Sequence, residues 1–210
     1  MLDRRAVHVG FVLGCALAVA TSARAAPEPR RGVYASGALG GAYGRARFSD
    51  GHNAGTSLGA GAQVRGAFGL GVVDGLAVAA ELRLLLHGGE AQLGPLDDRS
   101  VHGAGFIVAG VLVDYYPAPL GPLHMQLGLG WTSVSPTGES ASGALSNGPE
   151  GSPVSEQVGA FGHAGFGYTW RSDRGLGFGP VLDVYAARAS SHPATCVAYG
   201  VALDLVLVAF

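Results

Sequence analysis

Residues 57–70 decide the fold and read SLGAGAQVRGAFGL. Each even position from Leu58 to Leu70 holds an apolar residue or Gly, whereas the odd positions between them hold Gly, Ala, Gln63 and Arg65. Side chains that alternate in polarity with a period of two indicate a β-strand with two different faces. The stretch therefore predicts one long strand with an apolar face and a face of small and polar residues.

The alternation resumes directly after Val73-Asp74-Gly75, with an apolar residue at each even position from Leu76 to Leu86. The three intervening residues fit a hairpin loop in which Gly75 adopts a left-handed conformation. Such a loop would pair Val72 with Leu76 and would keep both apolar sets on one side of the sheet.

The same alternation recurs between turns rich in Gly and Pro, and it predicts eight strands. The predicted strands cover residues 32–48, 57–72, 76–87, 104–115, 123–132, 158–170, 176–184 and 197–210. Tight turns alternate with longer connections, which we place at residues 50–53, 88–100, 134–156 and 188–195. This arrangement predicts an all-β fold, an eight-stranded antiparallel up-and-down transmembrane β-barrel with both ends on its periplasmic side.

A soluble barrel of the lipocalin type is the alternative, since it also has eight alternating strands. Such a barrel turns its apolar face inward, and its outer surface needs roughly 25 to 35% charged residues. Charged residues make up only 13% of this chain, and the more polar strand face consists mostly of Gly and Ala. That face suits a narrow interior and the Leu-rich face suits lipid, so the composition favours a membrane barrel.

The N-terminus has the three parts of a bacterial signal peptide. Arg4 and Arg5 precede an apolar run over residues 9–20, and small residues follow it. Lipoprotein processing at Cys15 is the alternative. We expect a signal peptide at 1–25, a short periplasmic tail at 26–31 and a barrel domain at 32–210.

Charge and cysteine content limit what the exported chain can do. Without residues 1–25 it carries ten Arg, no Lys and fourteen Asp or Glu, a formal charge of −4. This balance offers no broadly basic surface for nucleic acid. Cys196 is then the single cysteine, so no intrachain disulfide can form.

Aromatic residues are expected to form two belts at the membrane interfaces. The periplasmic belt would contain Tyr34, Phe68, Tyr115, Tyr168 and Trp170. The outer belt would contain Tyr43, Phe48, Trp131 and Tyr199. The facing of the first and last strands stays open, because Asp204 interrupts the apolar set in phase with Phe210.

Titratable residues on the inward face lie at similar heights when counted from the tight turns. They are Arg65, Glu81, Arg83, His163, Asp183 and Asp204. Unpaired charges in a narrow lumen are costly, so opposite charges that converge there predict a mutually neutralising structural layer. The same groups could instead line a gated pore or a proton path.

We predict no catalytic, cofactor-binding or metal-binding residue. His and acidic residues near the longer connections could meet a zinc ion, but their spacing matches no defined ligand motif and favours solvated rim residues. They are His52, His87, Glu90, Asp97, Asp98, His102 and His192. Gly138–Ser142 nearly reads Gly-x-Ser-x-Gly but lies in a Gly/Ser/Pro-rich loop, and His124 is interpreted as a lumen filler.

Two other features suggest surface contacts. Arg45 and Arg47 lie near the outer end of the first strand and could meet lipid phosphates or form a plain basic rim. The connection at 134–156 is rich in Ser, Gly and Pro without apolar periodicity, and it could serve unknown surface ligands.

In strand count, loop asymmetry, signal peptide and terminal Phe210, the chain resembles the small outer-membrane barrels of the OmpA, OmpX and OmpW type. The resemblance is architectural and carries over no catalytic residue. It implies a place in the bacterial outer membrane, insertion by the barrel-assembly machinery, and contact with outer-membrane lipid and lipopolysaccharide. We expect a non-enzymatic barrel that supports envelope integrity or surface interaction; a narrow channel for small molecules and a lipid A modifying enzyme are the alternatives.

Overall fold

The computed structural model of the chain describes residues 32–49, 54–92, 100–117, 121–137, 157–172 and 175–209. The strands are β1 (Gly32–Ser49), β2 (Ala54–Val73), β3 (Leu76–Gln92), β4 (Ser100–Tyr115), β5 (Leu123–Thr137), β6 (Gln157–Tyr168), β7 (Trp170–Arg171), β8 (Leu176–Ser191) and β9 (Ala194–Ala209). The two-residue β7 continues β6 after a break at Thr169 and pairs with the same neighbour, β8. The expected signal peptide, tail and Phe210 lie outside the described residues.

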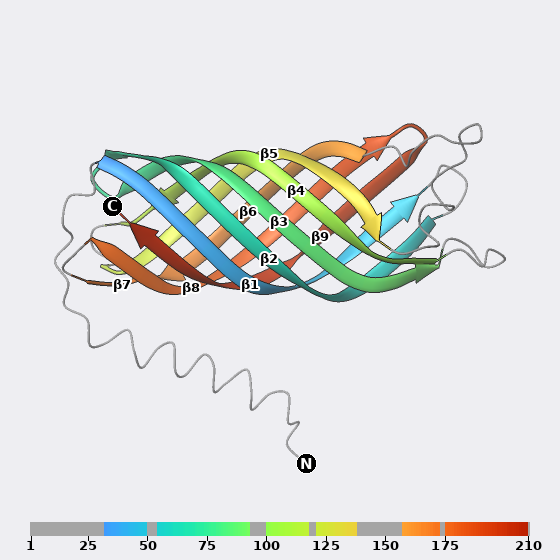
Figure 1. Cartoon of the computed structure of the whole chain (residues 1–210), viewed down its shortest axis with the longest axis horizontal. Helices are drawn as coiled ribbons and strands as arrows, with labels where there is room; N and C mark the ends of the chain where they lie inside the picture. The colour runs from blue at the N-terminus through green and yellow to red at the C-terminus, as the bar shows by residue number, and fades with distance from the viewer. Residues whose placement is uncertain are drawn as a thin grey trace, which may run out of the picture.

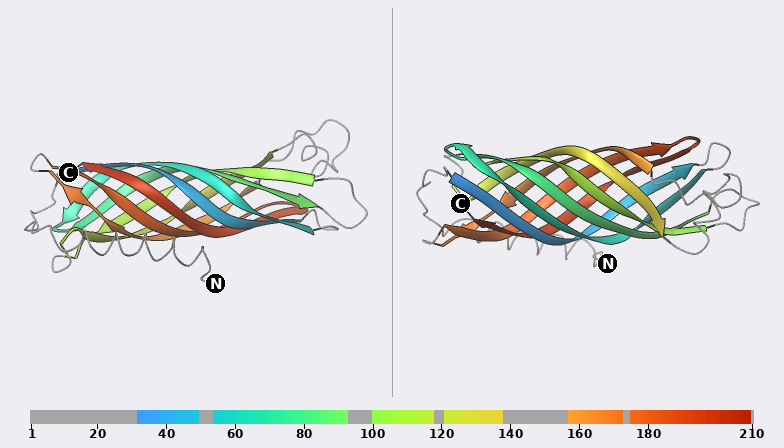
Figure 2. Two further views of the ribbon diagram at one scale, coloured as in Figure 1. Left: turned by 90° about the horizontal axis from the view of Figure 1, so that it is seen from below. Right: turned by 45° about the horizontal axis from the view of Figure 1, so that its top comes forward.

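The strands form one closed antiparallel barrel in which consecutive strands pair, except that β6 and β7 both pair with β8 (Figures 1 and 2). β1 pairs with β9, and β6 pairs with β8, so the sheet has no free edge. With β6 and β7 counted as one interrupted strand, this confirms the predicted all-β barrel of eight antiparallel strands. Closure satisfies the backbone hydrogen bonds of every strand within the protein.

Side-chain facing follows the period-two pattern of the sequence. Large apolar side chains point outward along the barrel wall, as Leu39, Leu82 and Leu205 illustrate with exposed fractions above 60%. Most polar residues in the middle of the strands point inward instead, together with many of the Ala and Gly residues. This facing is the reverse of that in a lipocalin-type barrel, whose interior is apolar.

The first and last strands, whose facing the sequence left open, follow the same rule. On β9 the set Val201, Leu203, Leu205 and Leu207 is exposed, and Asp204 is buried.

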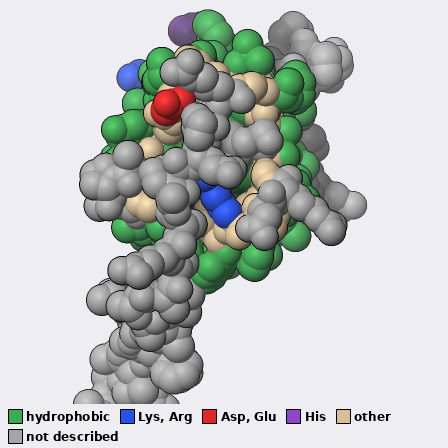
Figure 3. All heavy atoms as spheres, turned by 90° about the vertical axis from the view of Figure 1, so that its left-hand side faces the viewer, with side chains coloured by type: hydrophobic (Ala, Val, Ile, Leu, Met, Phe, Trp, Pro, Cys, Tyr) green, Lys and Arg blue, Asp and Glu red, His purple; other side chains and the backbone are tan. Residues whose placement is uncertain are grey.

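Figure 3 looks onto one end of the barrel, where hydrophobic side chains ring the outside and basic side chains lie within that ring. Among the described residues, no helix is long and apolar enough to cross a membrane.

The hairpin between β2 and β3 differs in register from the prediction. Val73, and not Val72, pairs with Leu76, and an irregularity between Gly71 and Val73 absorbs the extra residue. Gly75 is left-handed as expected, with φ of 80°. A bulge beside a left-handed Gly is a common hairpin ending, and here it leaves the facing of both strands unchanged.

The two ends of the barrel differ in their connections. At the turn end, which we define by the links at residues 74–75, 116–122 and 172–175, β1 also begins and β9 ends. The loop end, at the other side, carries the links at 50–53, 93–99, 138–156 and 192–193. The predicted loop at 188–195 is wrong, because β8 and β9 pair as far as Ser191 and Ala194.

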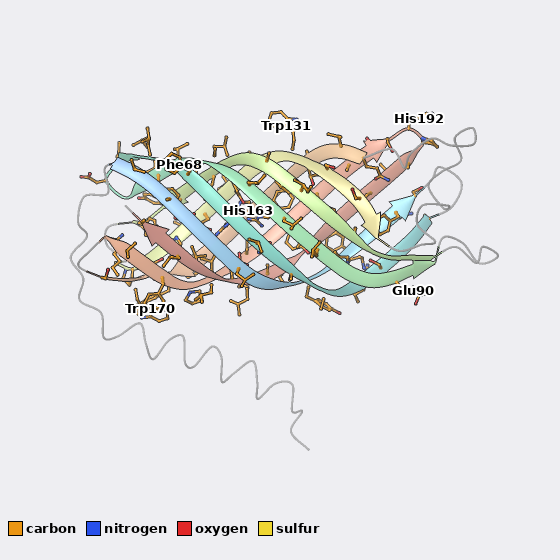
Figure 4. All side chains as sticks on the ribbon, viewed as in Figure 1. Phe68, Glu90, Trp131, His163, Trp170 and His192 are labelled. Carbon is orange, nitrogen blue, oxygen red and sulfur yellow. The ribbon has the colours of Figure 1, made fainter. Side chains whose placement is uncertain are left out.

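The aromatic belts are only partly as expected. Phe68, Tyr115, Tyr43, Tyr199 and Trp131 are exposed on the wall, and Figure 4 shows Trp131 pointing away from it. Tyr34 and Phe48 were wrongly assigned to the belts, because both are fully buried inside the barrel. A buried Tyr hydroxyl usually has a polar partner, so Tyr34 is expected to have one in the interior.

Candidate functional site

The interior of the barrel is polar, and its central part is a group of hydrogen-bonded charged residues. We define the central network as Gln63, Glu81, Arg83, His163, Asp183 and Asp204, all of them buried. They come from β2, β3, β6, β8 and β9, so the network joins strands around most of the barrel. His163 is labelled in Figure 4 near the middle of the barrel's length.

Arg83 is the hub of the central network and is fully buried. Its Nε donates to Glu81 Oε1 at 3.0 Å, and its Nη1 donates to Asp183 Oδ2 at 2.8 Å. The guanidinium also lies 5.1 Å from the centre of the Phe161 ring. A planar fork with several donors can hold two carboxylates at once, which a lysine cannot do with the same geometry.

His163, on β6, bridges the same two carboxylates. Its Nδ1 lies 2.9 Å from Asp183 Oδ1, and its Nε2 lies 2.9 Å from Glu81 Oε2. An imidazole donates through both nitrogens only when both carry a proton. The arrangement therefore fits a positively charged His163, so that two cations face two carboxylates.

Asp204 joins the network through a neutral residue. Gln63 Nε2 donates to Asp204 Oδ1 at 2.7 Å, and Gln63 Oε1 accepts from Arg83 Nη1 at 3.3 Å. The sequence places Gln63 on the inward face, but its lack of charge kept it out of the predicted layer. Its role depends on a register that brings β2 next to β3 and Asp204 within reach across β1.

Arg65 is buried like the other five predicted residues but stands apart from them. Within the described part of the chain, its three guanidinium nitrogens have no hydrogen-bond partner. Arg65 pairs in register with Arg83 on β3, so the two side chains share one face of neighbouring strands. With Arg65 included, the six predicted residues supply three basic groups and three carboxylates.

Glycines make room for the large polar side chains. A Cβ at Gly128 would collide with His163 Nε2 and Glu81 Oε2, and one at Gly40 would collide with Asp204 Oδ1. Both glycines lie on the inward face of their strands. Small residues on this face are therefore a condition for the network, which explains why the inward face is rich in Gly.

A second polar group, the turn-end cluster, consists of Tyr34, Asp114, His124, Gln126 and Thr169, all of them buried. Tyr34 Oη donates to Asp114 Oδ2 at 2.9 Å, and His124 Nδ1 lies 2.7 Å from Asp114 Oδ1. Gln126 Nε2 donates to the same carboxylate at 3.3 Å. His124 also stacks on the Tyr116 ring, with centroids 4.5 Å apart. The sequence analysis interpreted His124 as a lumen filler and did not predict that it joins the other four residues in a cluster.

The turn-end cluster contains an acid, an imidazole and a hydroxyl in series. His124 Nε2 lies 3.2 Å from Thr169 Oγ1, so the imidazole can donate to Asp114 and accept from Thr169. Hydrolytic triads have the same connectivity. However, the Thr169 side chain is 1% exposed, which leaves no approach for a substrate. The cluster instead ties together β1, β4, β5 and the break between β6 and β7.

The possible metal-binding residues near the loop end are not brought together by the described structure. No group of three His, Cys, Asp or Glu side chains suited to a metal occurs among the described residues. His87 is buried and not at the rim as expected, whereas Glu90 and His192 are exposed. His52, Asp97, Asp98, the His102 side chain and Gly138–Ser142 lie outside the residues that the structure describes.

Comparisons with known proteins give structural likeness only. No protein-family model and no curated protein matches the chain. Neisserial surface protein A aligns with a TM-score of 0.49 and 13% identity, over 87% of this chain and 100% of that chain. The outer membrane protein OprG from Pseudomonas aeruginosa aligns with a TM-score of 0.48 and 14% identity, over 87% and 99%. Ail, the attachment invasion locus protein of Yersinia pestis, aligns in its complex with sucrose octasulfate with a TM-score of 0.37 and 9% identity, over 83% and 98%.

Proposed function

We propose that the chain is a non-enzymatic barrel that spans the bacterial outer membrane with a closed lumen. The observation that carries this proposal is the apolar outer wall, because large side chains such as Leu129 and Leu203 are more than half exposed there. Exposed apolar surface on this scale has no favourable partner in water. Lipid provides one, and a closed barrel leaves no backbone group unsatisfied in it.

The height of the apolar wall fits a bilayer. On β1 every outward residue from Val33 to Tyr43 is apolar or Gly, and on β8 the outward residues from Leu176 to Ala186 are apolar. Either span rises about 33 Å along its strand, or about 25 Å along the barrel axis at a tilt of about 40°. Outer-membrane barrels carry an apolar band of about 25 Å.

Membrane insertion can be tested by fractionation and gel migration. The full chain, expressed in a Gram-negative host, is expected in the outer-membrane fraction and is expected to migrate faster unheated than boiled. The matched pair is Leu203→Arg on the outer wall and Ser190→Arg near the loop end of the same wall. Leu203→Arg should lower the free energy of unfolding by about 2 to 4 kcal/mol and so weaken the folded band. Ser190→Arg should leave the folded band almost unchanged. Recovery of the wild type only as a soluble folded protein would refute the proposal.

The closed lumen rests on the central network and the turn-end cluster, which place buried side chains across the interior at two heights. Glu81 and Asp183 each contact both Arg83 and His163, and carboxylates paired in this way are more stable in a closed interior than ions left without partners. A narrow gated channel is the second candidate, since the same charged groups would line its path. Conductance in planar bilayers separates the two.

In that experiment, wild-type protein is expected to show no steady channels, and Arg83→Ala is expected to show openings because it removes the hub of the network. Val201→Ala, on the outer wall, is the control and should stay closed. Steady wild-type channels of defined size would overturn the closed lumen and favour the channel.

We infer a contribution to envelope integrity or to surface interaction through residues 138–156. A deletion strain should become sensitive to detergent or lose surface binding, and a chain with a short Gly/Ser linker in place of 140–154 should restore only the former. A lipid A profile that changes with the deletion would instead favour the enzyme alternative.

A further inference from the structure

We propose that three outward arginines at the loop end form a docking site for the phosphate groups of an outer-leaflet glycolipid. Arg45 and Arg47 lie near the end of β1, and Arg188 lies near the end of β8. This inference rests on the proposed function, because only a membrane-spanning barrel brings its wall against lipid headgroups. The sequence pointed to Arg45 and Arg47, whereas the fold adds Arg188.

The strand register brings the three arginines together. β9 lies between β1 and β8, and Val197 pairs with Arg47 on one side and with Arg188 on the other. Two strand spacings separate the Cα atoms of Arg47 and Arg188 by about 10 Å, and two residues separate Arg45 and Arg47 by about 7 Å. At least 140 residues of sequence lie between Arg188 and the other two, so only the closed barrel makes them neighbours.

These guanidinium groups are free to take an external anion. All three side chains are exposed, and none of them forms an ion pair with a carboxylate of the described residues. Arg45 Nη1 donates one long hydrogen bond, 3.4 Å, to Tyr199 Oη on β9. A guanidinium group can donate two parallel hydrogen bonds to the oxygens of a phosphate. Exposed arginines without a carboxylate partner therefore suit a phosphate ligand.

The arginines lie at the level where headgroup phosphates are expected. On β1 the apolar wall ends at Tyr43 and the next outward residue is Arg45. On β8 it ends at Ala186 and the next outward residue is Arg188. Trp131 on β5 pairs with Ala160 on β6, and Ala160 pairs with Arg188 on β8. Trp131 and Arg188 therefore lie in one row of paired residues. Aromatic residues mark the membrane interface, so charge begins on this side of the barrel where the hydrocarbon ends.

A lipid that binds here would place acyl chains against the apolar wall and its phosphates against the arginines. Lipid A, whose diglucosamine carries phosphates at both ends, has the required chemistry. A free phosphate ion would meet only the arginines and would gain nothing from the wall. A phosphorylated lipid is therefore the occupant to which this geometry points.

The test uses native mass spectrometry of the full chain in detergent, with bisphosphorylated lipid A and the same lipid A without phosphates as probes. Wild-type protein is expected to retain the phosphorylated form preferentially. Arg45→Gln, Arg47→Gln and Arg188→Gln together should weaken that retention about a hundredfold, and each alone about fivefold. Arg171→Gln is the control for loss of one positive charge, because this half-buried arginine lies over the Tyr116 ring at the turn end, and it should retain the phosphorylated lipid as wild type does.

Equal retention of both lipids by wild type, or unchanged retention by the triple variant, would overturn the inference. Displacement by inorganic phosphate alone would also overturn it, since the site would then bind any phosphate and not a lipid. Heat-modifiable migration of each variant verifies the barrel, and the single variants decide the outcome if the triple variant does not fold. A wild type without membrane insertion would refute the proposed function instead, so the two failures are distinct.

Discussion

The two polar groups inside the barrel stabilise buried carboxylates in different ways. In the central network Glu81 and Asp183 are held by cations, since both contact Arg83 and His163. In the turn-end cluster the single carboxylate of Asp114 is held by hydrogen-bond donors from Tyr34, His124 and Gln126. Both groups are fully buried, so the difference lies in the partner chemistry and not in the burial.

The two groups should therefore respond differently to the loss of one partner. A buried carboxylate that loses one of its counter-ions keeps a charge that is only partly balanced, which costs more than one missing hydrogen bond. The central network should therefore depend on each cation. The turn-end cluster should tolerate the loss of one donor, because the others remain.

The largest effect is expected for Arg83→Ala. The change leaves Glu81 and Asp183 with only His163 between them, and it removes the donor to Gln63. We expect the free energy of unfolding in detergent to fall by about 4 kcal/mol. The measurement is the folded fraction against urea concentration, followed by unheated gel migration. Arg83→Lys keeps the charge and should recover part of the loss; equal losses for both variants would show that charge balance is not the cause.

A smaller effect is expected for Gly128→Val, which keeps every charge but removes the space that His163 needs. Overpacking at this position should lower the free energy of unfolding by about 2 to 3 kcal/mol. Gly66→Val is the matched control, because a Cβ at that position would meet nothing within 4 Å. Similar unfolding midpoints for the two variants would contradict the close approach at Gly128.

The smallest effect is expected for Tyr34→Phe, which removes one donor from Asp114 and leaves His124 and Gln126 in place. The loss should be about 1.5 kcal/mol in the same urea titration. Tyr43→Phe, on the outer face of the same strand, is the control and should change the midpoint little. A loss as large as that of Arg83→Ala would erase the distinction between the two groups.

Much of this fold could be predicted from the sequence because its strands alternate strictly. The long run from Ser57 to Leu70 fixes which face is apolar, and the hairpin at Gly75 carries that facing into the next strand. Strand ends were predicted less well. Hydrogen-bonded pairing continues past the apolar band, as at Ser190 and Thr195, where small polar residues give no contrast between the faces.

The interior could be predicted only in part. Charge made Glu81, Arg83 and Asp183 conspicuous on the inward face, and the structure buries all three. Gln63 was left out of the charged layer and Tyr34 was assigned to the periplasmic belt, because an uncharged residue on a strand face does not by itself reveal a polar partner in the interior. Their importance comes from partners more than 75 residues away, Asp204 and Asp114, which only the barrel closure brings within reach.

The sequence by itself determined the period of two, the facing of most strands and the predominance of small residues on the inward face. These are local properties, since each depends on residues a few positions apart. The tertiary structure decided which charges meet and which arginines share a surface. Register and closure set those distances, as Arg47, Val197 and Arg188 show by lying in one row across three strands.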